Sequence, residues 1–273
     1  MIQGYMSLFT VLEELSVLNR DNGISFTDTT RLDAIASLLR DSDYLKIEAK
    51  GLFHLYSKKP IDQIKGPIVI VSSHVDCEYH ITECFTRFED ADTMMGTYDN
   101  AITNASITYL MREGNLPENV LIAFTGDEEE NSGGARDISK YIRKNHLDVK
   151  HIIVLDVTGE GWNQNADFTV ENNFWDDSVG EKIIRLVRET GYEWFFVPSE
   201  KGEFPDYVPK ERIIDIEAYE DESWEYDEYD LSCCSFCIPT YGEMHCNEGV
   251  LARTTSFRRY TEVLEKLLVD LLL

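Results

Sequence analysis

Apolar positions along the chain predict strands that alternate with helices. Continuous apolar runs begin at residues 68, 120 and 152, within the segments PIVIVSSHVD, VLIAFTGDEEE and HIIVLDVTG. Such runs are typical of strands buried on both faces. Further strands are predicted in LKIEAKGLFHLYSK, as a pair broken near Gly51, and in EWFFVPSE. Apolar residues at helical spacing predict helices over residues 5–18, 31–40, 100–112, 134–145, 178–190 and 251–272.

This alternation predicts the fold class. Strands separated by helices favour an α/β fold with a largely parallel sheet. We therefore expect a three-layer αβα sandwich, with helices on both faces of a mixed, mostly parallel central sheet. The sequence contains no internal repeat and no linker rich in Pro, Gly and Ser. A single domain over residues 1–273 is the simplest organisation.

Composition and charge exclude several classes of protein. No stretch of about 20 apolar residues occurs, which excludes a membrane-spanning helix. The N-terminus lacks the basic region of a signal peptide, so we expect a cytoplasmic protein. The formal net charge of −26 argues against binding to nucleic acid or to an anionic membrane. The oligomeric state is left open.

Polar residues follow the predicted buried strands at the point where each strand ends. His74 and Asp76 follow the first strand, the run 127–130 (DEEE) follows the second, and Asp156 follows the third. In open α/β sheets this edge is where ligands bind. The loop before the helix at 100–112 adds Asp99, and a segment near the C-terminus adds His245.

So many carboxylates at one edge predict a metal centre. Like charges repel strongly in a partly buried site, and divalent cations remove that repulsion. Two histidines and three carboxylates suit a pair of zinc ions, with a shared carboxylate between metals about 3.5–4 Å apart. Each motif alone also fits a surface His, a solvated acidic run or a helix cap; their joint placement favours the metal centre.

The motifs resemble those of the co-catalytic zinc exopeptidases, the superfamily of bacterial leucyl aminopeptidases, glutamyl aminopeptidases and glutamate carboxypeptidases. The matching segments are SSHVD, GTYDNAITNASITYLM, LIAFTGDEEENSGGA, VLDVTG and IPTYGEMHCNEG. They cover most of residues 65–160 and 236–272. The short spacing between the motifs leaves no room for an inserted domain, so the chain resembles the compact, single-domain members.

The resemblance implies a ligand for each metal. His74 and Asp156 would bind one ion, Glu129 and His245 the other, and Asp99 would bridge them. These ions would be divalent, with zinc expected.

Two further carboxylates have implied roles that do not involve metal binding. Asp76 would orient His74 through the far ring nitrogen. Glu128 would be the general base, which takes a proton from water and passes it to the leaving nitrogen. The family's base directly precedes its ligand, so the pair 129/130 also satisfies the rule, but Phe124 and Thr125 favour 128/129.

The expected function is a two-zinc exopeptidase, most simply an aminopeptidase acting on a peptide or small amide substrate. The absence of an Arg-rich patch for a substrate carboxylate favours an aminopeptidase over a carboxypeptidase. One alternative is an N-acyl amino acid deacylase, or another amidohydrolase, with the same metal site. Another is a non-catalytic metal-binding interaction protein. No GxSxG, P-loop or GxGxxG motif points to other chemistry.

Two segments leave alternatives open. Residues 215–230 hold nine acidic residues and no Lys or Arg. They fit a solvated acidic loop, or an acidic and aromatic wall that binds a substrate amino group or basic side chain. Cys233, Cys234 and Cys237 fit buried thiols on or beside a strand, or a CxxC metal or redox site.

Overall fold

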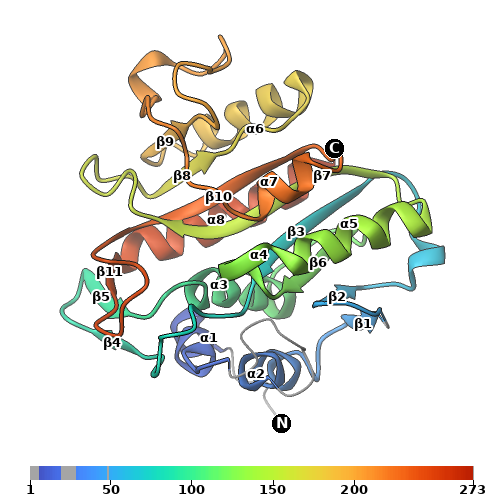
Figure 1. Cartoon of the computed structure of the whole chain (residues 1–273), viewed down its shortest axis with the longest axis horizontal. Helices are drawn as coiled ribbons and strands as arrows, with labels where there is room; N and C mark the ends of the chain where they lie inside the picture. Colours follow the sequence, from blue (N-terminus) through green and yellow to red (C-terminus); the bar gives the residue numbers. More distant parts are fainter. Residues whose placement is uncertain (1–5, 20–28, 48, 273) are drawn as a thin grey trace.

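The predicted α/β fold is confirmed by the computed structural model, which describes residues 6–19, 29–47 and 49–272 (Figure 1). Four parallel strands form the centre of the sheet in the order β6, β3, β7 and β10. Their bounds are Ile68–His74 for β3, Val120–Thr125 for β6, Val149–Thr158 for β7 and Cys233–Tyr241 for β10.

Antiparallel strands extend this centre on both sides. On one side β2 (Phe53–Ser57) pairs with β6, and β1 (Leu45–Ile47) pairs with β2. On the other side β8 (Phe168–Glu171) is antiparallel to β10, and β9 (Trp194–Val197) is parallel to β8. The end of β10 also continues into a small antiparallel ribbon of β11 (Val250–Arg253), β5 (Thr93–Gly96) and β4 (Thr86–Phe88).

Helices cover both faces of the sheet, as expected for three layers (Figure 1). One face carries α1 (Leu8–Leu15), α2 (Thr30–Leu38), α3 (Ala101–Glu113) and α8 (Thr254–Asp270). The other carries α4 (Glu128–Asn131), α5 (Gly133–Asn145) and α7 (Glu222–Asp227). Helix α6 (Asp177–Glu189) packs against α8, and short 3-10 turns lie at Ile61–Gln63 and Lys210–Arg212.

The continuous apolar strands arise because successive side chains enter different cores. In β3, Val69 and Val71 join the core under α1, α3 and α8, whereas Ile68 and Ile70 join the core under α5 and α7. Strands β6 and β7 alternate in the same way. Since side chains point to opposite faces in turn, a strand covered on both sides needs apolar residues at every position.

Several details differ from the sequence-based expectation. The helix expected over 251–272 begins at Thr254, because residues 250–253 pair with β5 as strand β11. The elements β4, β5, β8 and α7 were not predicted. The three clustered cysteines lie on β10 and are buried, which agrees with the interpretation as core thiols. Residue 5 of the first expected helix lies outside the described residues, and the single-domain organisation stays a prediction.

Within the described ranges, no helix combines the length and the apolar character needed to cross a membrane.

The two-core arrangement predicts where stability resides. Leu121 is fully buried in the core under α5, whereas Leu45 is half exposed at the sheet edge. Leu121→Ala should lower the free energy of unfolding by about 2–5 kcal/mol, because it leaves a cavity. Leu45→Ala should change it by less than about 0.5 kcal/mol. Urea denaturation of both variants measures the difference, and equal losses would contradict this packing.

Candidate metal centre

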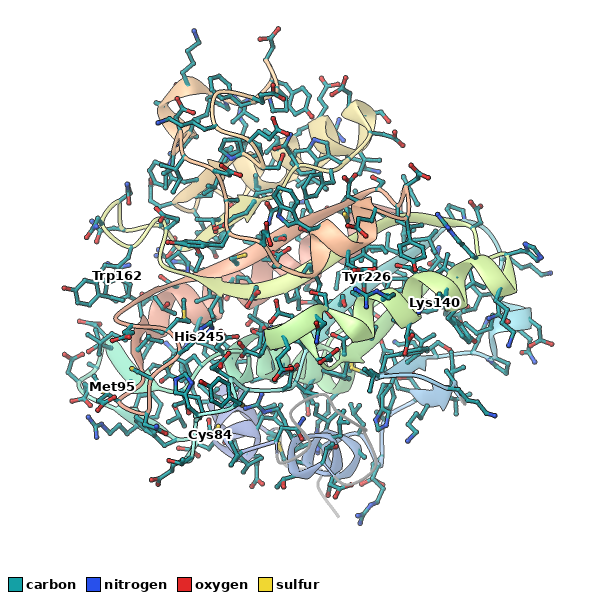
Figure 2. All side chains as sticks on the ribbon, in the orientation of Figure 1. Cys84, Met95, Lys140, Trp162, Tyr226 and His245 are labelled. Atoms are coloured by element: carbon teal, nitrogen blue, oxygen red, sulfur yellow. The ribbon has the colours of Figure 1, made fainter. Side chains whose placement is uncertain are left out.

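The five predicted ligands converge at the carboxyl edge of the parallel strands. His74 is the last residue of β3, and Asp156 lies near the end of β7. Glu129 lies in the short helix α4 that follows β6, and Asp99 precedes α3. His245 lies in the loop between β10 and β11. Figure 2 shows it apart from Tyr226, which marks the position of α7.

Asp99 lies between the two histidines. Its Oδ1 is 2.9 Å from Nε2 of His74, and its Oδ2 is 3.1 Å from Nε2 of His245. Each oxygen of one carboxylate therefore faces a different imidazole. This is the arrangement that a carboxylate bridging two cations requires.

A second carboxylate accompanies each histidine. Nε2 of His74 is 3.6 Å from Oδ1 of Asp156, and Nε2 of His245 is 3.4 Å from Oε2 of Glu129. Glu129 also lies close to His74 and Asp99, whereas Asp156 belongs to neither of the clusters whose ligand atoms lie within 4.8 Å of one another. The division into two ligand sets stays a prediction. The side chains of His74 and Glu129 are buried, whereas the side chain of His245 is half exposed and faces the solvent.

Asp76 lies behind His74 and away from the cluster of ligand atoms. Its Oδ1 is 3.5 Å from Nδ1 of His74, and its Oδ2 accepts a hydrogen bond of 3.2 Å from the backbone N–H of Glu129. Asp76 is almost fully buried. One carboxylate thus faces the His74 ring and also fixes the start of α4.

The turn after β6 places the paired glutamates. Asp127 adopts a left-handed backbone with φ of 61°, and α4 begins at Glu128. Glu128 and Glu129 are partly buried at the site, with Oε2 of Glu128 3.8 Å from Nε2 of His74, whereas Glu130 is exposed. This placement supports the pair 128/129 over 129/130. Gly134 lets α5 pack here, because a Cβ would lie 2.6 Å from the carbonyl oxygen of Leu52.

Burial and mutual repulsion shift the pKa values of the acidic groups. Burial, with a contribution from Asp99, raises the pKa of Glu129 to about 10. Burial also raises the pKa of Asp156 to about 6 and that of Glu128 well above its usual range. For Asp99, burial would raise the pKa, but the hydrogen bond with His245 and the nearby imidazole of His74 outweigh it and lower the pKa. Burial is the main cause of the raised pKa values, and neighbouring carboxylates add to it, as expected where acidic groups crowd together.

The donor set fits divalent metal ions. Nε2 of His74, Oδ1 of Asp99 and Oε1 of Glu129 are buried without a hydrogen-bond partner among the described residues. Ligand atoms of these three residues lie within 4.8 Å of one another. Buried polar atoms are normally paired, so orphaned nitrogen and oxygen atoms that face one point are expected where a cation binds.

One residue of this centre was not found from the sequence. A carboxylate oxygen of Glu78 lies within 4.8 Å of ligand atoms of Glu129 and His245. In the sequence, Glu78 stands two residues after Asp76 but belongs neither to the HxD motif nor to the end of a predicted strand. Sequence patterns therefore did not identify it.

A cavity of 680 Å³ opens beside the candidate metal centre. Its lining joins Asp99, Glu128, Asp156 and His245 to side chains of the acidic segment 215–230, among them Trp224. That segment is therefore not a solvated loop throughout. Its Glu222 is fully buried and accepts a hydrogen bond of 2.7 Å from Oγ of Ser72 in β3.

No protein-family model matches the chain, and no curated protein matches it. Solved structures do match. The LapA aminopeptidase of Legionella pneumophila is 12% identical with a TM-score of 0.65, over 97% of this chain and 70% of LapA. The TET1 peptidase of Pyrococcus horikoshii is 10% identical with a TM-score of 0.66, over 97% of this chain and 100% of TET1.

The aminopeptidase PepT of Bacillus cereus is 9% identical with a TM-score of 0.67, over 98% of this chain and 100% of PepT. The fold expected from the sequence motifs is thus confirmed along nearly the whole chain. The chain has the fold of these aminopeptidases.

Proposed function

We propose that this protein is an aminopeptidase that uses two divalent metal ions, with zinc as the expected metal. The observation that carries the proposal is the position of Asp99, whose two oxygens face His74 and His245 separately. The fold shared with LapA, TET1 and PepT supports it. When bound, the ions would polarise the scissile carbonyl and activate water for attack.

Asp76 positions the site and does not bind metal. Its carboxylate faces Nδ1 of His74, which leaves Nε2 directed at the cluster of ligand atoms. A carboxylate behind a ligating histidine fixes the ring orientation and raises the basicity of the nitrogen on the far side.

Glu128 is the proposed general base. Burial is the main cause of its raised pKa, and a raised pKa suits a group that must accept a proton and then release it. Its Oε2 would take a proton from the attacking water and deliver it to the leaving amide nitrogen. Its neighbour Glu129 instead accompanies His245 as a ligand.

Removing the shared carboxylate should empty the site. Asp99→Ala should lose both metal ions, because each set of ligands would keep a single carboxylate. Asp76→Ala should keep its ligands and weaken metal binding by about 10–100-fold. Metal content after dialysis against zinc buffers measures both effects. Retention of one full equivalent by Asp99→Ala would show that Asp99 is not a bridge.

Replacing Glu128 and replacing Glu129 should have different effects on metal binding and on the reaction rate. Glu128→Gln keeps the size of the side chain and removes the basic oxygen. It should bind near-normal metal and lose about 10²–10⁴-fold in kcat. Glu129→Gln should lose metal as well as activity.

Glu130→Gln is the matched control, because Glu130 is exposed one position further along the same helix. It should keep both metal and turnover. Metal analysis and a rate assay on all three variants decide whether the base and the ligand are Glu128 and Glu129 or Glu129 and Glu130. Loss of metal in Glu130→Gln, with metal retained in Glu129→Gln, would move the assignment by one residue.

The reaction itself is tested with a panel of aminoacyl p-nitroanilides beside N-acyl amino acids. The metal-loaded protein should release p-nitroaniline, and a chelator should abolish the activity until zinc is restored. Cleavage of N-acyl amino acids alone would assign the site to a deacylase. A metal-loaded protein that cleaves no amide in the panel would contradict the enzymatic proposal.

A further inference from the structure

The cavity beside the metal centre is lined by acidic groups that the proposed catalysis does not use. Glu171 and Asp221 both line it, and neither belongs to the proposed ligands or base. Among the described residues that form its lining there is no Lys and no Arg. The ligand that fills this cavity must therefore neutralise carboxylates rather than bring further negative charge.

Glu171 is the stronger of the two observations. It is only 3% exposed at the end of β8, yet it borders the cavity. One of its oxygens accepts a hydrogen bond of 2.5 Å from Oγ1 of Thr169. Burial and the nearby charge of Asp221 raise its pKa to about 8. Within the part of the chain that the structure describes, no Lys, Arg or His forms an ion pair with Glu171. A buried carboxylate without a cationic partner is unusual and expensive in free energy.

Asp221 is held in place next to Glu171. It is the N-cap of α7, and its Oδ1 accepts a hydrogen bond of 2.8 Å from the backbone N–H of Ser223. The hydroxyls of Ser223 and Ser235 also donate to it. The rotamer of this carboxylate is thus set by the protein before any ligand arrives.

The strand register gives the distance between this pair and the metal centre. Asp156 on β7 is level with Cys237 on β10, which is level with Thr169 on β8. Two strand spacings separate Asp156 from Thr169, which is about 10 Å. Glu171 lies two residues beyond Thr169, level with Ser235, and therefore on the same face of the sheet. Two residues along a strand add about 7 Å, so the Cα atoms of Glu171 and Asp156 are about 12 Å apart.

The distance between Glu171 and the proposed metal ions determines which positively charged group of a substrate can reach Glu171. The α-amino group of a peptide is two bonds from the scissile carbonyl carbon, about 2.5 Å, and it must stay close to the metal ions. A lysine or arginine side chain carries its charge about 6–7 Å from Cα. A side chain of this length, directed along the cavity, suits the distance to Glu171, which the α-amino group held at the metal ions would not span.

We propose that Glu171 and Asp221 bind the ammonium or guanidinium group of the substrate, so that this enzyme removes N-terminal lysine or arginine residues. The inference rests on the proposed aminopeptidase function. It adds a substrate class and two specificity-determining residues.

A binding experiment tests the cation site without turnover. L-lysine and L-norleucine have the same carbon chain, and only lysine carries the ε-ammonium group. Isothermal titration calorimetry of the metal-loaded protein should show lysine binding about 10–100-fold more tightly than norleucine. Glu171→Gln should reduce that preference to within about threefold.

The matched control is Asp227→Asn, which removes one negative charge from the exposed end of α7 outside the cavity. It should keep the full preference for lysine. Asp221→Asn is the second variant and should weaken lysine binding while norleucine binding changes little. Thermal melting of each variant shows whether it is folded. Equal affinities for lysine and norleucine in the wild-type protein would overturn the inference.

Rates separate this inference from the proposed function. The value of kcat/KM should be higher for lysyl and arginyl p-nitroanilides than for leucyl and glutamyl ones, and Glu171→Gln should lower the lysyl-to-leucyl ratio. Faster cleavage of leucyl substrates, with no preference for lysine in binding, overturns the cation site and leaves the aminopeptidase standing. Tight lysine binding with cleavage of N-acetylcadaverine instead of peptides would keep the cation site and overturn the peptide substrate.

Discussion

Repulsion between carboxylates at the carboxyl edge of the parallel sheet is the constraint on which the rest of this structure depends. Asp99, Glu128, Glu129 and Asp156 all lie around His74, and burial raises the pKa of three of the four. For His74, burial lowers the pKa, but the surrounding carboxylates outweigh it and raise the pKa well above the usual value. A protonated imidazole offsets one negative charge. Two divalent cations would offset all of them and fill the orphaned ligand positions.

The fold supplies rigidity where this charge is concentrated. Strands β3 and β7 are packed on both faces, so His74 and Asp156 project from backbone that cannot relax. His245 comes from a loop and is half exposed. The candidate site thus combines His74 and Asp156, which the sheet holds in place, with His245, which comes from a loop, and Asp156 and His245 both line the cavity. Sites on packed strands hold geometry better than sites on loops.

The sequence predicted what depends on strand periodicity and on strand ends. Continuous apolar runs identified β3, β6 and β7, and the residues that follow them identified His74, Glu129 and Asp156. The loop before the helix at 100–112 and a segment near the C-terminus added Asp99 and His245, and the structure brings both to the same place. The role of each residue came from the motif resemblance. Their roles as ligands stay predictions.

Other features lie beyond sequence patterns because they depend on tertiary pairing. Strand β8 has four residues, and its significance comes only from the register with β10 that places Glu171 at the cavity. Helix α7 lies within an acidic segment that composition alone favours as a solvated loop. Its Glu222 is buried because Ser72 of β3 provides a hydrogen bond that no local pattern encodes. Glu78 likewise lies near Glu129 and His245 through tertiary contacts that no local pattern encodes.

The central claim is that Asp99 holds two metal ions, one beside each histidine. The most direct measurement is an anomalous difference map from a crystal of the zinc-loaded protein, recorded on both sides of the zinc absorption edge. The account predicts two peaks about 3.5–4 Å apart, with one oxygen of Asp99 about 2.0–2.2 Å from each. A single peak bound by His74 alone, or two peaks that Asp99 does not contact, would contradict it.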